Sequence, residues 1–201
     1  FIYYLKLIEN VGPGRAGYIA VVMPVFHKGA LVGFSANTAH HVDIGAATPG
    51  LIIDVPDMWA EGMLLDAVKL YEAGNRVESL WKYIRDNTRV PDLVMGDLEA
   101  QIASAELGVR RFEELLEKYG KDDVISSCNQ LMDYTERLMR REISKIPDGE
   151  YFAEGFLDDD GRNRDKTLPI KVCVKVNGDS VEIDLTGSAD QVPTAFNVPF
   201  D

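Results

Sequence analysis

The sequence is poor in cysteine and histidine, and this argues against several common kinds of site. Its 201 residues include two cysteines, Cys128 and Cys173, and three histidines. The cysteines form no CxxC motif, which argues against a thiolate zinc site and against a secreted domain held by disulfides. We therefore expect free thiols and a cytoplasmic location.

The chain also lacks long apolar runs and an excess of basic residues. No stretch reaches the roughly 18 apolar residues that a membrane helix needs. Lys and Arg number 21 against 33 Asp and Glu, which gives a formal net charge of -12. Negative charge repels phosphate groups, so we expect binding neither to nucleic acid nor to a membrane. The chain starts within the apolar run 1–8 without a methionine or a signal sequence, and we expect it to be a fragment of a longer protein.

The first part of the sequence predicts a β-hairpin followed by an irregular loop. Tyr18–Phe26 is nearly all apolar, as in a strand that is buried on both faces. His27–Ala30 has the composition of a turn, with Gly29 free to adopt positive φ, and Leu31–Ala36 returns as a second strand. Residues 46–75 are broken by proline and glycine and show little periodicity, which predicts a loop.

The rest of the sequence predicts helices and then strands. A short helix is expected over Glu78–Arg85. Apolar residues spaced by three or four predict two long helices, joined at Gly120 as an antiparallel hairpin. Turn residues then separate three short apolar runs, which predict an antiparallel β-meander. The expected long elements are helices over Leu93–Tyr119 and from Asp122 to about Lys145, and strands over Tyr151–Leu157, Leu168–Val176 and Ser180–Leu185.

These elements together predict an α+β fold. It consists of an N-terminal β-hairpin and irregular loop, a central long helical hairpin and a C-terminal antiparallel β-meander. The corresponding regions are residues 19–75, 76–147 and 148–201, preceded by a separate segment over residues 1–18.

Two adjacent histidines beside a carboxylate are the most distinctive chemical feature of the sequence. They lie in the segment His40-His41-Val42-Asp43. Imidazole and carboxylate groups are common ligands of Zn²⁺, Mn²⁺ and Fe²⁺. In an extended backbone His41 and Asp43 share one face, while His40 points to the other. The same pattern also suits a polar strand end without a metal, and a metal site needs at least one further ligand.

An ordered series of motifs resembles the hydantoinase B/oxoprolinase family. The similar positions run from about residue 19 to residue 200. The series comprises Val25-Phe26, Gly29, Leu31–Phe34, Ala39–Gly45, Pro49-Gly50, Glu61-Gly62, Lys69–Tyr71, Asn87–Pro91, Gly96–Leu98, Ala100-Gln101, Tyr119-Gly120, Pro147–Gly149, Asp160-Gly161, Asp184–Ser188, Gln191 and Phe196-Asn197.

The resemblance implies a two-part enzyme with a divalent metal. In such enzymes an A-type subunit uses ATP to phosphorylate a carbonyl or lactam oxygen, and the B-type subunit completes hydrolysis or carboxylation with its metal. The resemblance makes His41 a metal ligand, with Asp43 and His40 as ligands or supports. The other ligands of the family come from an upstream His-x-x-Asp, and Arg15 and Tyr18 occupy those two positions here.

Three functional hypotheses follow. The first is metal-assisted hydrolysis of a hydantoin, 5-oxoproline or other cyclic amide, or carboxylation, with an ATP-dependent A-type partner. The second is a noncatalytic remnant or assembly module that has lost the metal site, and the weakest is a stand-alone small enzyme. Because a fragment exposes apolar surface that is normally covered, we also expect a homo-oligomer.

Overall fold

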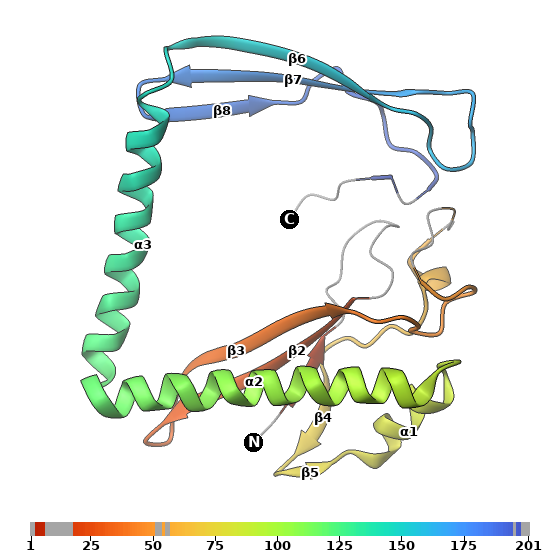
Figure 1. Ribbon diagram of the computed structural model, residues 1–201, viewed down its shortest axis with the longest axis vertical. Helices are drawn as coiled ribbons and strands as arrows, with labels where there is room; N and C mark the ends of the chain where they lie inside the picture. The colour runs from red at the N-terminus through yellow and green to blue at the C-terminus, as the bar shows by residue number, and fades with distance from the viewer. Residues whose placement is uncertain (1–2, 7–17, 51–53, 55–56, 195, 198–201) are drawn as a thin grey trace. The chain divides into compact units, whose positions relative to one another are not determined.

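A computed structural model describes residues 3–6, 18–50, 54, 57–194 and 196–197 (Figure 1). For residues 3–6 and 58 it describes the backbone alone. The chain divides into two compact units. The first contains residues 1–118 and 193–201, and the second contains residues 119–192. Helices and antiparallel sheets occur in both, which confirms the α+β class. Within the described ranges no helix combines the length and the apolar character needed to cross a bilayer.

The first unit contains a five-stranded antiparallel sheet. Its strand order is β3-β2-β1-β4-β5. The predicted hairpin is confirmed, although its second strand continues past Ala36 to His40. The strands of this sheet are β1 (Tyr3–Lys6), β2 (Tyr18–His27), β3 (Ala30–His40), β4 (Val68–Glu72) and β5 (Asn75–Arg76).

The prediction that residues 46–75 form only a loop is wrong at its C-terminal end. β4 and β5 form a second hairpin there, and a 3₁₀ turn covers Met58–Glu61. The hairpin is short and mostly polar, so its pattern is weak in the sequence. It is nevertheless fixed by Leu70, which is fully buried, and by the positive φ of Ala73 and Gly74 in the turn. The strand β1, which the sequence analysis did not predict, lies between β2 and β4.

Helices α1 (Glu78–Asp86) and α2 (Pro91–Tyr119) follow this sheet in the chain. Both were predicted, although α2 begins at Pro91, where a proline lacks the N–H that a first helical turn leaves unpaired. Figure 1 shows α2 running along the β2–β3 hairpin. A stripe of α2 is buried, and it consists of Val94, Leu98, Gln101, Ile102, Ala105, Val109 and Leu116.

One face of the hairpin packs against α2. The helix lies close to β3: Asn37 hydrogen-bonds to Gln101, and a Cβ atom added at Gly108 or at Gly33 would meet Ser35 or Phe112, respectively. Because side chains alternate along a strand, the odd-numbered residues of β3 face the helix. From Gly33 to Ala39, before the register shifts near the turn, the cross-strand partners of these residues lie on the same face of β2 and are buried. These partners are Ile19, Val21, Met23 and Val25.

The second unit contains α3 (Lys121–Ile143) and a three-stranded antiparallel sheet. The sheet order β6-β7-β8 confirms the predicted meander. Its strands are β6 (Gly149–Leu157), β7 (Leu168–Asn177) and β8 (Ser180–Asp184).

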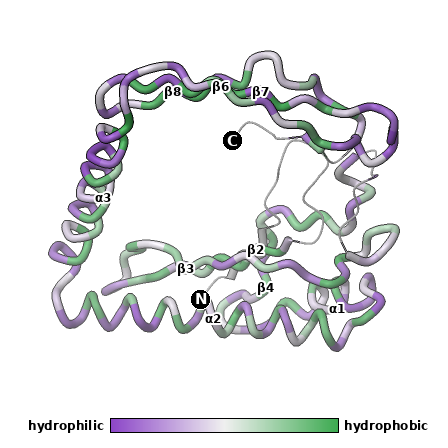
Figure 2. The backbone as a smooth tube through the Cα atoms, turned by 45° about the horizontal axis from the view of Figure 1, so that its top comes forward, coloured by the Kyte–Doolittle hydropathy of each residue, from purple (hydrophilic) through white to green (hydrophobic). Residues whose placement is uncertain are grey.

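Helix α3 exposes much of its apolar side. Figure 2 shows hydrophobic and hydrophilic residues alternating along it, yet within the helix only Val124 is buried. Leu131 and Met139 are 63% and 60% exposed. The compact units divide at the junction of the two long helices, where Gly120 has φ +85. The antiparallel packing of α2 against α3 therefore stays a prediction.

The close approach of α2 to β3 predicts different tolerance for two glycines of the same helix. A Cβ atom at Gly108 would lie 2.2 Å from Ser35 Oγ and 3.2 Å from Ser35 Cβ, while a Cβ at Gly96 would meet open space. Replacing Gly108 by Val should therefore lower the free energy of unfolding by about 1–3 kcal/mol, the usual cost of overpacking. Gly96→Val should be nearly neutral, and equal effects in urea unfolding would contradict this packing.

Candidate functional site

His41 follows the last residue of β3 and lies on the face that α2 covers. Its side chain is buried, with 4% of the residue exposed. Its Nε2 atom lies 2.7 Å from Oε1 of Gln101 on α2. The other ring nitrogen, Nδ1, is buried and has no hydrogen-bond partner among the described residues. A buried polar atom without a partner is costly in a folded protein, so this nitrogen is a candidate ligand-binding atom.

His40 points to the opposite face of the strand, as the alternation of side chains predicted. It is exposed and pairs across the hairpin with Tyr18. The two rings stack with their centroids 3.6 Å apart at an angle of 35°. His40 therefore lies beside the position where the resemblance places the carboxylate of the upstream motif, and here that position carries a phenol. The other aligned position, Arg15, lies outside the described residues.

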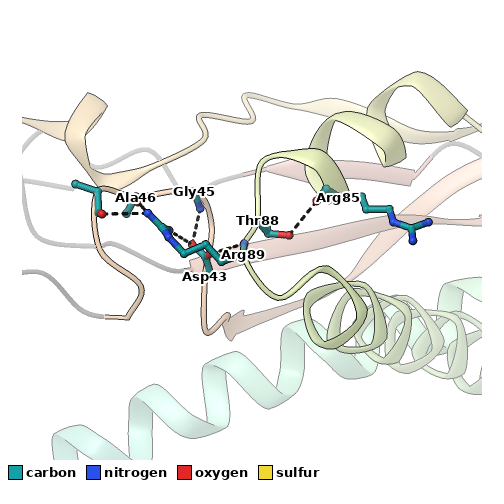
Figure 3. A network of polar contacts seen from close by, with 7 residues as sticks. Asp43, Gly45, Ala46, Arg85, Thr88 and Arg89 are labelled. Carbon is teal, nitrogen blue, oxygen red and sulfur yellow. Dashed lines mark hydrogen bonds and ion pairs between the residues drawn. The ribbon is translucent and has the colours of Figure 1, made fainter.

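Asp43 is the centre of a network that closes the loop after β3 (Figure 3). Its side chain is fully buried. The backbone N–H groups of Gly45 and Arg89 donate to its two oxygens at 2.9 and 2.6 Å. The Arg89 guanidinium donates to Oδ1 at 3.0 Å and to the carbonyls of Ala46 and Ala47 at 2.8 and 3.0 Å. These bonds join the loop to the turn before α2.

The environment of Asp43 favours the charged carboxylate. Burial acts to raise its pKa, but the hydrogen bonds from the Arg89 and Gly45 backbone and the Arg89 guanidinium outweigh burial and hold the pKa below its ordinary value. Three donors, one of them the Arg89 cation, already satisfy this carboxylate, so it supports the loop. Gly45 is needed in the same loop, because it has φ +82 and a Cβ there would lie 2.7 Å from the Asn87 carbonyl oxygen.

The structure separates the three predicted ligands into different environments. His41 contacts α2, His40 contacts Tyr18, and Asp43 contacts Arg89. Among the residues that the structure describes, no three His, Cys, Asp or Glu side chains come together as a metal site. Whether His41, Asp43 or His40 binds a metal therefore stays a prediction.

Two residues outside the predicted ligand set contribute to this region. Gln101 and Arg89 both lie within motifs that resemble the family, but their partners are more than 40 positions away in sequence. No local pattern identifies such partners. The sequence contains one weak indication of this role for Gln101, which is that a polar glutamine lies on the apolar stripe of α2.

The sequence of the chain is similar to those of known proteins. The model of one family, described as hydantoinase B/oxoprolinase, matches residues 15–201. The chain belongs to the hydantoinase B/oxoprolinase family. The chain is 48% identical over 186 residues to the B subunit of a putative D-/L-hydantoinase of Pseudomonas sp. (strain NS671), covering 90% of this chain and 31% of that protein. It is 35% identical over 175 residues to the beta subunit of the caprolactamase of Pseudomonas jessenii, with 87% and 30% covered.

Solved structures of similar proteins have the same fold. The crystal structure of the ATP-dependent caprolactamase from Pseudomonas jessenii matches with a TM-score of 0.85 and 32% identity, over 98% of this chain and 34% of that chain. The nucleotide-free structure of acetone carboxylase matches with a TM-score of 0.87 at 17% identity, over 98% of this chain and 28% of that chain, which shows the fold alone. The chain spans about a third of the length of the hydantoinase and caprolactamase subunits named above.

Removal of the Arg89 guanidinium should destabilise the loop after β3. Arg89→Met leaves the buried Asp43 carboxylate without its cation and frees two loop carbonyls. A buried charge that loses its partner costs about 3–5 kcal/mol, but Arg89 is 48% exposed and solvent screens the pair. We therefore expect a loss of about 2 kcal/mol in urea unfolding.

Arg85→Met is the matched control for this substitution. Arg85 is exposed, and in Figure 3 its side chain points away from Asp43. Its replacement should change the free energy of unfolding by less than about 0.5 kcal/mol. Equal losses in the two variants would show that the network does not hold the loop.

Proposed function

We infer that this chain is part of a B-type subunit that acts with an ATP-dependent A-type partner on a small molecule. The reaction is hydrolysis of a cyclic amide, or carboxylation of a related carbonyl compound. The names of its relatives support this proposal, since they include subunits of a hydantoinase and a caprolactamase and also a 5-oxoprolinase. Hydantoin, caprolactam and 5-oxoproline are all cyclic amides. The delta subunit of an acetophenone carboxylase, which is also among the relatives, supports the carboxylation alternative.

A divalent metal, Zn, Mn or Fe, would fit this role through His41. The buried Nδ1 atom without a hydrogen-bond partner among the described residues is the single observation that carries this assignment. Neutral imidazole nitrogen is a common ligand for all three metals. When bound, such a metal polarises a carbonyl and lowers the pKa of a bound water. The remaining ligands would come from outside the described residues, and ATP would bind only to the A-type partner.

The protein's own residues would hold His41 in place. Gln101 fixes one edge of the imidazole ring from α2. Asp43 and Arg89 close the loop that follows, so the backbone on both sides of His41 is restrained. His40 would flank the site on the open face of β3 beside Tyr18. Asp43 and His40 are thus supports in this proposal.

A noncatalytic assembly module is the second candidate. It is favoured because two of the three predicted ligands already have protein partners. Arg89 neutralises Asp43, and the Tyr18 ring covers one face of His40. In that case the chain folds without metal and still binds an A-type partner in the cytoplasm. Both candidates are compatible with a homo-oligomer, which would bury apolar residues such as those of α3.

Metal binding by His41 separates the two candidates. The purified chain should be stripped with a chelator, reloaded with Zn²⁺, Mn²⁺ or Fe²⁺, and analysed by mass spectrometry for bound metal. Loss of a residue that supports a metal ligand typically weakens metal binding by about 10–100-fold, and loss of the ligand itself should cost no less. We therefore expect His41→Ala to weaken metal binding by at least about tenfold.

His27→Ala is the control for this experiment. His27 is also buried, but it lies at the β2–β3 turn and its Nδ1 atom is 3.5 Å from Glu117 Oε1. This variant should bind metal like the unmodified chain. If the unmodified chain binds no metal at micromolar concentration and still binds an A-type partner, the assembly module is the correct function.

A further inference from the structure

Two side-chain amides connect His41 to the backbone of β2 and α2. The Gln101 Nε2 atom donates to the Ile19 carbonyl and to Asn37 Oδ1, both at 2.9 Å. The Asn37 Nδ2 atom donates back to the Gln101 backbone carbonyl at 2.8 Å. The Gln101 Oε1 atom then faces His41 Nε2 at 2.7 Å. Gln101 is itself 93% buried, since 7% of it is exposed.

Backbone carbonyls fix the direction of both amides. A carbonyl oxygen accepts and never donates, so the Gln101 carbonyl requires the NH₂ group of Asn37. Asn37 therefore turns its oxygen toward the Gln101 side chain. The Ile19 carbonyl and this oxygen both require the NH₂ group of Gln101. Reversal of either amide would place acceptors against each other in a buried region.

The orientation of Gln101 decides which nitrogen of His41 carries the proton. Its Oε1 atom can only accept, so the His41 Nε2 atom must donate. A neutral imidazole has one ring proton, and Nδ1 is then left with a lone pair. This is the buried nitrogen that has no partner in the described part of the chain.

We propose that Gln101 and Asn37 are positioning residues that hold His41 as the Nε2–H tautomer and present Nδ1 as a buried electron-pair donor. A divalent cation is the class of ligand that such a nitrogen binds, and this choice of ligand rests on the proposed function. Ligand histidines in metal sites usually donate their second ring N–H to an acceptor, which fixes ring orientation. Here the acceptor is the Gln101 side chain, which is oriented by hydrogen bonds to the Ile19 carbonyl and to Asn37, and Asn37 is oriented by the Gln101 backbone carbonyl. We call this hydrogen-bonded set the relay, and it supplies the acceptor without a carboxylate.

The tautomer can be read directly from the ring nitrogens in metal-free protein. The chain has three histidines, so a ¹H–¹⁵N spectrum of the imidazole rings at about pH 8 contains three pairs of signals. His27→Ala and His40→Ala identify the pair that belongs to His41. We expect a protonated Nε2 and an unprotonated Nδ1 in one fixed form.

Variants of the relay should change this pattern. Gln101→Met keeps the side-chain length but removes the acceptor, so the His41 signals should move toward the averaged values of exchanging tautomers. Asn37→Ala removes one of the two contacts that orient Gln101, and it should shift the signals less in the same direction. Gln130→Met is the matched control, because this glutamine is exposed on α3 and contacts Ser126. It should leave the pattern unchanged.

Two results would overturn the relay. One is a His41 ring protonated at Nδ1 in the unmodified protein, a result that does not depend on whether Gln101→Met folds. The other is a His41 pattern that both relay variants leave unchanged. Addition of Zn²⁺ then tests the proposed function separately. A fixed Nε2–H tautomer without a Zn²⁺ response supports the relay and rejects the metal site, whereas a response confined to His41 Nδ1 supports both.

Discussion

The packing of α2 along β3 is the constraint on which the candidate site depends. The helix lies so close that a Cβ atom at Gly108 would meet the Ser35 side chain at 2.2 Å. This contact fixes which face of β3 is buried, because side chains alternate along a strand. His41 is therefore enclosed with Gln101, and His40 projects from the other face beside Tyr18. Two neighbouring histidines with identical chemistry thus receive different environments from one packing contact.

A buried ion pair restrains the chain immediately after this strand. The Asp43 carboxylate is fully buried, and a charge in that position is tolerated only with hydrogen bonds and a counterion. Arg89 supplies both, and it also binds two carbonyls of the loop. Because Arg89 lies in the turn just before α2, the loop and the helix are held by the same residue. The backbone around His41 is in this way fixed from both ends.

Local periodicity predicted most of the fold, whereas contacts between distant residues escaped prediction. The apolar run of β2 and the spacing of α2 specify their elements without help from the rest of the chain. The short β4 strand does not, since it is placed in the sheet by pairing with β1, more than 60 positions away in sequence. The alternation rule correctly placed His40 and His41 on opposite faces. It could not identify Gln101 as a partner, because that contact spans 60 positions.

A double-mutant cycle between His41 and Gln101 tests the central claim most directly. His41→Phe and Gln101→Met are each made alone and together, and the free energy of unfolding is measured for all four proteins. If the buried hydrogen bond links the end of β3 to α2, the two substitutions should be coupled by about 1–2 kcal/mol. Additive effects, within about 0.3–0.5 kcal/mol, would show that the two side chains do not interact in the folded protein.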